Sequence, residues 1–352
     1  MLFFVLYGIT AAIPLIASAY LLLRRANAIA PSVTSPVRLR RWTASFFAVA
    51  TLAHVWWLLF YIFSGDLHSV SCAVLSMVDC VLLFVTFVGM LFAMLQDRRR
   101  PVWPALAAML PFVSLGTANI VFSDSQLVKM ASIYLLLLGL AFTGYMVYAI
   151  RQYERWLNNN YADLEDKKVW LCLTVSLACM LMFILYVFAD DMTLIWLVHF
   201  VELLLVGLLL WRVETLPLLE QLPVHPQTQQ PTASPVTIDL AIELLLQQHC
   251  IDTQLYLQRD LTINQLAQAL GTNRTYLSQY FSSLDTTYNA YINKLRIDHF
   301  CRLYQEEMAA NHYPTAQQLF SRCGYRSYST FSLAFKQRMG QSVASWMREN
   351  TK

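Results

Sequence analysis

Four ionisable side chains lie within long apolar stretches of this chain: His54, Asp79, His199 and Glu202. An acidic side chain in the middle of a membrane span costs about 2.5–3.5 kcal/mol to insert, so such residues usually face a bundle interior or a cavity. His199 and Glu202 are three residues apart, which places them on one face of a helix. The four residues therefore predict an intramembrane sensing site for a ligand or a proton. The alternative is interhelical hydrogen bonding that holds a bundle together.

Neither a metal centre nor an enzyme active site is predicted from the sequence. His199 and Glu202 alone do not make a metal site, and no further ligand cluster is evident beside them. We find no phosphate-binding loop, serine-hydrolase elbow or zinc-protease motif, and no histidine-kinase phosphoacceptor with an ATP-binding region. We therefore expect no catalytic residues, no metal and no cofactor.

A second group of polar residues follows the pattern of a helix-turn-helix. Residues 266–281 read LAQALGTNRTYLSQYF. Apolar residues at helical spacing end at Gly271, a short polar turn follows, and Asn273 is suited to cap a new helix. Thr262 and Gln265 have the spacing of a capping box at the start of the first helix.

The same pattern occurs a second time. Thr315 and Gln318 repeat the capping box 53 positions later, and Gly324 matches Gly271 at the same offset. Ser327 then matches Asn273 at an offset of 54, so the second turn is one residue longer. Residues 286–307 lie between the two units, largely follow helical spacing and would span about 33 Å. Because adjacent major grooves on one side of B-DNA are ~34 Å apart, one chain could place two recognition helices in them.

Residues 255–350 resemble the DNA-binding domain of the AraC/XylS transcription regulators. The resemblance is carried by LAQALGTNRTYLSQYF, by YINKLRI at 291–297 and by CGYRSYSTFSLAFKQRMGQS at 323–342. The sequence departs from the family pattern at Asp285, in a region where the family usually has Gly, and at Val343, where it usually has Pro. It also departs at Leu333, where family members often carry a polar or basic residue that reads DNA.

The resemblance implies which side chains contact DNA. Gln can form paired hydrogen bonds with adenine, and Ser or Thr can contact several bases. Arg274, Arg326, Lys336 and Arg338 are expected to meet phosphates, which fixes register without reading sequence. The full expected set is Asn273, Arg274, Thr275, Ser278, Gln279, Arg326, Ser327, Tyr328, Ser329, Thr330, Ser332 and Lys336. The expected core residues of the two units are Leu266, Leu277, Phe281, Phe331 and Phe335.

A strongly apolar region precedes these motifs. Hydrophobic residues make up 57% of the 352 residues and charged residues only 13%, which is typical of a membrane protein. Seven stretches have the ~20 apolar residues needed to cross a membrane: about 2–23, 42–63, 70–95, 102–122, 127–150, 169–189 and 193–211. The predicted fold is all-α: a seven-helix transmembrane bundle at 1–212, a Pro- and Gln-rich linker at 213–236, and an AraC-type tandem helix-turn-helix domain at 237–352.

The distribution of Lys and Arg predicts the orientation of the spans. The connections 24–41, 96–101 and 151–168 contain twelve Lys and Arg in total, whereas 64–69, 123–126 and 190–192 contain none. Positively charged loops stay on the cytoplasmic side of a membrane. The N-terminus is therefore predicted to lie outside the bacterial inner membrane and the C-terminal domain in the cytoplasm.

Taken together, the sequence predicts a multi-pass, one-component transcription regulator that binds promoter DNA and responds to a signal sensed in the membrane. Its expected partners are double-stranded promoter DNA, the lipid bilayer, RNA polymerase, an unknown small ligand or membrane partner, and a second copy of the chain. Two alternatives stay open. One is a membrane receptor or transporter-like protein whose C-terminal domain binds a protein partner; the other is a regulator whose spans serve only as an anchor.

Overall fold

The computed structural model describes residues 2–24, 26–63, 70–172, 174–175, 177–179, 192–219 and 235–350. Within these residues helices are the regular secondary structure, apart from one isolated antiparallel bridge between Tyr161 and Thr262, which confirms the predicted all-α class. The chain divides into two compact units. The N-terminal unit comprises Met1–Tyr153 and Val169–Gln221, and the C-terminal unit comprises Glu154–Lys168 and Leu222–Lys352.

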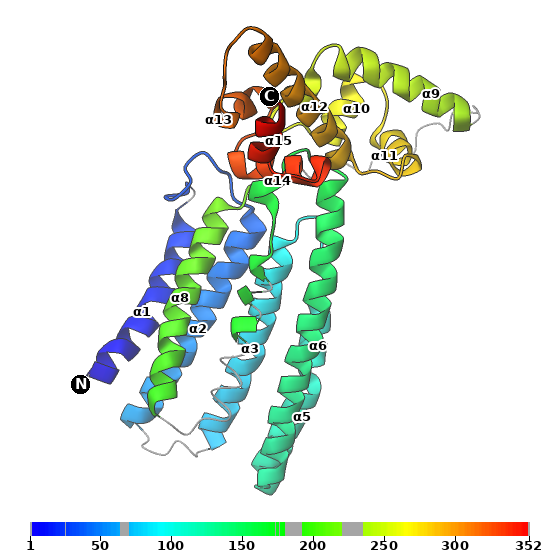
Figure 1. Ribbon diagram of the computed structural model, residues 1–352. Helices are drawn as coiled ribbons and strands as arrows, with labels where there is room; N and C mark the ends of the chain where they lie inside the picture. The colour runs from blue at the N-terminus through cyan, green and yellow to red at the C-terminus, as the bar shows by residue number, and fades with distance from the viewer. Residues whose placement is uncertain are drawn as a thin grey trace. The chain divides into compact units, whose positions relative to one another are not determined.

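The N-terminal unit is built from apolar helices. They are α1 (Leu2–Leu23), α2 (Val37–Phe63), α3 (Val70–Met94), α4 (Trp103–Ala108), α5 (Leu110–Phe122), α6 (Ser125–Asn158) and α8 (Met192–Thr215). Figure 1 shows α1 beside α2 and α8, and these three helices contact one another. Helix α3 packs against α2 on one side and against α4 and α5 on the other.

Six helical stretches in the described residues are long and apolar enough to cross a membrane, and they correspond to six of the seven predicted spans. The remaining predicted span, 169–189, lies largely outside the described residues. The predicted span 102–122 is divided at Met109 into α4 and α5. Pro111 at the start of α5 explains this division, because proline has no N–H to donate and its ring clashes with the preceding helical turn.

The end of α8 is tied to the rest of the N-terminal unit by hydrogen bonds. The Glu214 carboxylate accepts from the backbone N–H groups of Ala28 at 3.1 Å and Ile29 at 2.7 Å. The Asn27 side chain donates to the Glu214 carbonyl oxygen at 2.9 Å. Gln96 donates to the carbonyl oxygen of Pro217 at 3.0 Å. The chain therefore leaves α8 from a fixed position before the predicted linker, most of which lies outside the described residues.

The C-terminal unit consists of short helices arranged on both sides of one long helix. In chain order they are α9 (Pro235–Leu246), α10 (Ile263–Ala269), α11 (Arg274–Ser283), α12 (Tyr288–Ala309), α13 (Ala316–Leu319), α14 (Tyr328–Met339) and α15 (Val343–Asn350). Helix α12 is the predicted connecting helix. One hydrophobic core surrounds α10 and α11, and a second surrounds α14 and α15. All five predicted core residues are buried, which confirms them: Leu266, Leu277, Phe281, Phe331 and Phe335.

Candidate nucleic-acid interface

Both helix-turn-helix units begin at the predicted capping boxes. The Thr262 hydroxyl accepts from the backbone N–H of Gln265 at 3.3 Å, and the Gln265 side chain accepts from the backbone N–H of Thr262 at 2.9 Å. In the second unit the Gln318 side chain accepts from the backbone N–H of Thr315 at 2.7 Å. These bonds satisfy N–H groups that the first helical turn leaves without partners, so they fix where α10 and α13 begin.

The turns between the helices depend on glycine and on polar caps. Gly271 and Gly324 have φ angles of +66° and +80°, a region that favours glycine. A Cβ atom at Gly324 would lie 2.6 Å from the carbonyl oxygen of Leu257, so only glycine fits there. The side chain of Asn273 accepts from the backbone N–H of Tyr276 at 3.0 Å, and this cap starts α11. Ser327 starts α14 in the same way.

A buried arginine joins the two helix-turn-helix units. Arg296 lies on α12 and is only 1% exposed, and burial lowers its pKa. Its guanidinium donates to the backbone carbonyl oxygens of Tyr256 at 2.8 Å and Gln258 at 2.7 Å. The same group lies 5.4 Å from the ring centre of Tyr325. Tyr256 belongs to the first core and Tyr325 to the second, so Arg296 helps to hold the two units in one orientation. The motif YINKLRI contains this residue, but the motif alone does not predict its burial.

The predicted DNA contacts lie on α11 and α14 or at the caps of these helices. Asn273, Thr275, Gln279, Arg326, Ser329 and Lys336 are exposed, and Arg274, Ser278, Ser327, Tyr328, Thr330 and Ser332 are half-buried. The Tyr328 ring packs 5.7 Å from the ring of Phe320, so it lies at the edge of the second core. Contact of these twelve residues with DNA stays a prediction.

A segment from between two predicted spans forms part of the C-terminal unit. We call residues 159–167 the docked segment. The backbone N–H of Ala162 donates to Leu261 at 3.1 Å, and the backbone N–H of Ile263 donates to Asn160 at 3.0 Å. Ala162 is 2% exposed and belongs to the first core. The Asn289 side chain also donates to the carbonyl oxygen of Ala162 at 2.8 Å. Their position in the sequence predicts a loop of the membrane domain, whereas the structure packs these residues against the helix-turn-helix units.

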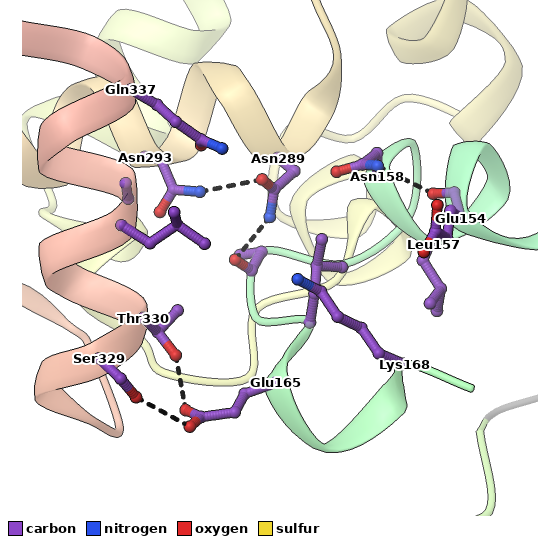
Figure 2. Close-up of a pocket in the computed structure, with 14 residues that line it drawn as sticks. Glu154, Leu157, Asn158, Glu165, Lys168, Asn289, Asn293, Ser329, Thr330 and Gln337 are labelled. Atoms are coloured by element: carbon purple, nitrogen blue, oxygen red, sulfur yellow. Dashed lines mark hydrogen bonds between the residues drawn. The ribbon is translucent and has the colours of Figure 1, made fainter. Parts of the chain in front are cut away.

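The docked segment places a carboxylate at the start of the second recognition helix. Glu165 accepts hydrogen bonds from the hydroxyls of Ser329 at 3.1 Å and Thr330 at 2.5 Å, and also from the Ser327 hydroxyl. Figure 2 shows Glu165 pointing toward Ser329 and Thr330. Burial by itself raises the pKa of Glu165, but these hydrogen bonds and the nearby Arg326 outweigh it, so the pKa lies below its ordinary value. The carboxylate is therefore held in its charged form.

Arg326 is paired with two carboxylates. Its guanidinium lies 2.5 Å from Asp166 of the docked segment and 2.7 Å from Asp260. Burial tends to lower the pKa of Arg326, but the two acidic residues outweigh it and raise the pKa. Glu165 and Asp166 are not among the site residues predicted from the sequence. The sequence signal was the acidic run DLED at 163–166, which contains three of the four acidic residues in the connection 151–168.

A cleft of about 420 Å³ lies beside this contact (Figure 2). Residues of the segment 154–168, of α12 and of α14 line it, among them Asn289, Leu333 and Gln337. The exposed Leu333 therefore faces open space and not a packed partner. Direct hydrogen bonds from the docked segment to α14 involve the first turn of this helix and its cap.

The structure brings three of the four intramembrane ionisable residues together. The Nε2 atom of His54 on α2 lies 3.4 Å from a carboxylate oxygen of Glu202 on α8. A ligand atom of His199 lies within 4.8 Å of both groups. The Tyr7 ring lies 5.0 Å from the His54 ring and 5.6 Å from the His199 ring. Asp79 lies apart from this cluster, in a small cavity lined by residues of α2 and α3.

Residues 266–349 match the family model of a helix-turn-helix domain of the AraC type, which confirms the resemblance. The comparisons with curated proteins and with solved structures gave no match. The matched range contains most of the first helix-turn-helix unit and all of the second. It supports a DNA-binding transcription regulator, and domains of this family are not usually catalytic. The apolar helices suggest membrane insertion, and the helix-turn-helix domain suggests a cytoplasmic C-terminus.

Proposed function

We propose that this protein is a one-component transcription regulator that binds promoter DNA while it is integrated in the bacterial inner membrane. The main support is that two helix-turn-helix units share one 22-residue helix, α12, in a chain whose other unit consists of apolar helices. At about 1.5 Å per residue α12 is ~33 Å long, which matches the separation of adjacent major grooves. The N-terminus lies outside, and residues 237–352 lie in the cytoplasm with access to RNA polymerase.

The two recognition helices α11 and α14 make different contacts with DNA. On α11, the exposed Thr275 and Gln279 meet base edges, and Gln279 is suited to adenine. On α14, Lys336 is exposed and meets a phosphate. Residues 236–352 contain 11 positive and 9 negative side chains, a net charge of +2. Because so small a charge gives little nonspecific affinity, binding depends on base contacts, on two half-sites or on a second copy of the chain.

The docked segment links the membrane unit to DNA binding. Glu165 occupies the start of α14, where helix dipole, backbone N–H groups and hydroxyls favour an anion such as a DNA phosphate. Asp166 neutralises Arg326, which is one of the residues expected at a phosphate. DNA and the docked segment therefore compete for α14. The docked segment directly follows α6 in the chain, so a movement of α6 in the membrane changes this competition.

The signal is sensed by the polar cluster of His54, His199 and Glu202. These residues connect α2 with α8, and α8 is the last helix before the linker to the C-terminal unit. Asp79 belongs to the predicted sensing set, but it lies outside this cluster, and the proposed sensing role does not include it.

DNA selection with the full-length protein in lipid nanodiscs tests the proposed function. We expect genomic fragments with a shared sequence to be enriched, and we expect Gln279→Ala to reduce the enrichment. If neither the parent nor a variant without Glu165 and Asp166 enriches any sequence, the C-terminal unit serves another purpose, such as binding a protein partner.

Two further experiments separate the remaining alternatives. Tags in 24–41 and after Trp211 should be cytoplasmic, and tags near Gly65 and Ser123 should lie outside; a cytoplasmic tag at Gly65 would contradict the topology. Replacement of all spans by one unrelated span should make promoter output independent of growth conditions. Output that still responds like the parent would mean that the spans act only as an anchor.

A further inference from the structure

The imidazole ring of His54 is oriented by the backbone of its own helix. Its Nδ1 atom lies 3.0 Å from the carbonyl oxygen of Ala50. Because a carbonyl oxygen only accepts hydrogen bonds, Nδ1 carries a proton and donates it. In a neutral ring the lone pair is then on Nε2. Histidines that bind metals usually have this second hydrogen bond, which fixes the tautomer and points the free nitrogen at the ion.

The lone pair of His54 faces a carboxylate. Nε2 lies 3.4 Å from an oxygen of Glu202, and both atoms are electron-pair donors when the ring is neutral. They require a proton or a metal ion between them, and the proton can be carried by the ring or by the carboxyl group. His199 supplies a third donor, because one ligand atom from each of the three residues lies within 4.8 Å of the others.

The distances suit a tetrahedral metal ion. Zinc binds imidazole nitrogen and carboxylate oxygen at ~2.0–2.2 Å, so two neighbouring ligand atoms are about 3.3–3.5 Å apart. The separation between His54 and Glu202 is already 3.4 Å. His199 completes the site once its side chain moves closer, because its ligand atom lies within 4.8 Å of the other two. His199 and Glu202 are three residues apart on one face of α8, so the helix itself presents both ligands together.

We propose that His54, His199 and Glu202 form a binding site for one divalent transition-metal ion of the zinc class. In this view the ion is the ligand of the membrane sensor, which rests on the proposed function. Two imidazoles and one carboxylate are ligands that zinc and its neighbours prefer, whereas magnesium and calcium prefer oxygen alone. Three protein ligands leave a fourth position open for water, whereas structural zinc sites use four protein ligands.

The position of the site connects it to the rest of the membrane unit. His199 is the eighth residue of α8, about 10 Å from the start of the helix, which faces the outside in the proposed topology. An ion bound there joins α2 to α8. The Tyr7 hydroxyl donates to the carbonyl oxygen of His54 at 2.8 Å, so α1 also contacts the site. The opposite end of α8 is held at Glu214 by residues 28 and 29. A change at the ion therefore reaches the point where the chain leaves the bundle.

Metal content of the full-length protein tests the proposal. The protein is prepared in nanodiscs without a polyhistidine tag, stripped with a chelator and titrated with Zn²⁺. We expect one bound ion per chain, measured by mass spectrometry, and a tetrahedral visible spectrum when Co²⁺ replaces Zn²⁺. Glu202→Gln and His199→Gln should each weaken binding at least 10-fold. The matched control is Asp79→Asn, which also neutralises an acidic side chain within the membrane unit but lies outside the cluster; it should bind Zn²⁺ like the parent.

Two results would overturn the metal site. One is a parent protein that takes up no ion, which is expected if His54 and Glu202 form a simple imidazolium–carboxylate pair. The other is a Glu202→Gln or His199→Gln variant that binds Zn²⁺ as tightly as the parent. Metal uptake and the Co²⁺ spectrum are measured on the parent protein first. The proposal can therefore be tested on the parent even if a variant fails to assemble.

DNA affinity measured with and without Zn²⁺ tests the sensor role separately. We expect at least a 3-fold change in the parent and none in Glu202→Gln. A parent that binds DNA and Zn²⁺ but shows no change would overturn the role of the ion as the signal. A parent that binds Zn²⁺ but no DNA would leave the metal site in place and overturn the proposed function.

Discussion

Removal of the two acidic side chains of the docked segment should strengthen DNA binding. The double variant Glu165→Ala/Asp166→Ala frees the hydroxyls at the start of α14 and removes one of the two carboxylates that form ion pairs with Arg326 in the described residues. DNA no longer has to displace the segment before a phosphate reaches this position. The docked state is therefore destabilised, and the free energy of DNA binding becomes more favourable by the amount that the contact contributed.

The size of the effect follows from the exposure of the contact. The side chains of Arg326 and Asp166 are 47% and 44% exposed, and surface ion pairs of this kind contribute about 0.2–1 kcal/mol. A carboxylate at a helix N-terminus contributes a further ~0.3–1 kcal/mol. Each hydroxyl hydrogen bond to Glu165 has a net value of about 0.5–1.5 kcal/mol, and solvent reduces it here. A total of ~2 kcal/mol corresponds to about a 30-fold gain in affinity.

The gain can be measured by fluorescence titration of labelled DNA with the full-length protein in nanodiscs. The matched control is Glu306→Ala/Glu349→Ala, which removes two exposed carboxylates from the same unit. At 0.15 M salt the Debye length is about 8 Å, so a general charge effect is small and equal in both variants. If the Glu165→Ala/Asp166→Ala variant binds DNA no more tightly than this control, the docked segment does not compete with DNA.

Other predictions concern the residues proposed to contact DNA, the junction of the two helix-turn-helix units and the pH dependence of the docked segment. Gln279→Ala should cost ~1–3 kcal/mol on the preferred sequence and little on random DNA, whereas Lys336→Ala should weaken both and reduce the salt slope by about one unit. Titrations of the preferred sequence and of random DNA check this. If Gln279→Ala lowers the affinity for both DNAs equally, Gln279 does not read a base. Arg296→Met should destabilise the C-terminal unit by ~2–4 kcal/mol, because two buried carbonyl groups lose a charged donor; unchanged hydrogen exchange in α12 would contradict this. The pKa of Glu165 is lowered in the docked state, so its stabilisation is present above the ordinary value of about 4.3 and is lost as the pH falls through the lowered value. Hydrogen exchange should therefore find residues 159–167 protected at neutral pH and less protected once the pH falls through the lowered pKa of Glu165, and a Glu165→Ala variant that keeps the parent's pH dependence would refute the assignment.

Local features of the C-terminal unit were predictable because their causes lie within a few residues. The caps at Thr262 and Asn273 and the turn at Gly271 are each set by neighbouring backbone groups. Spacing alone also predicted α12, because its apolar residues repeat at the helical period. The same holds for the apolar spans, whose length and composition are sufficient to identify them.

Contacts between distant parts of the chain were not predictable from one sequence. His54 precedes His199 by 145 positions, so the cluster that they form with Glu202 depends on how α2 packs against α8. Helix packing also decides that Asp79 lies outside the cluster. Asp79 is an acidic residue within an apolar span, as Glu202 is, so the sequence alone does not distinguish the two. The connection 151–168, which contains the docked segment, lies between apolar stretches and has basic residues near both ends, so its sequence predicts a loop of the membrane domain. Its position on the helix-turn-helix units depends on Ala162 entering their core.

DNA reading from the membrane is tested most directly by crosslinking the full-length protein to the chromosome and recovering it from the membrane fraction. We predict that the recovered DNA contains a shared sequence with two recognition sites about one helical turn apart, because the helix α12 that connects the two units is ~33 Å long. Gln279→Ala should lower the recovery of these fragments while the protein stays in the membrane fraction. Recovery of no specific DNA with the membrane-bound parent, or of the same fragments only with protein outside the membrane fraction, would contradict a regulator that reads DNA from the membrane.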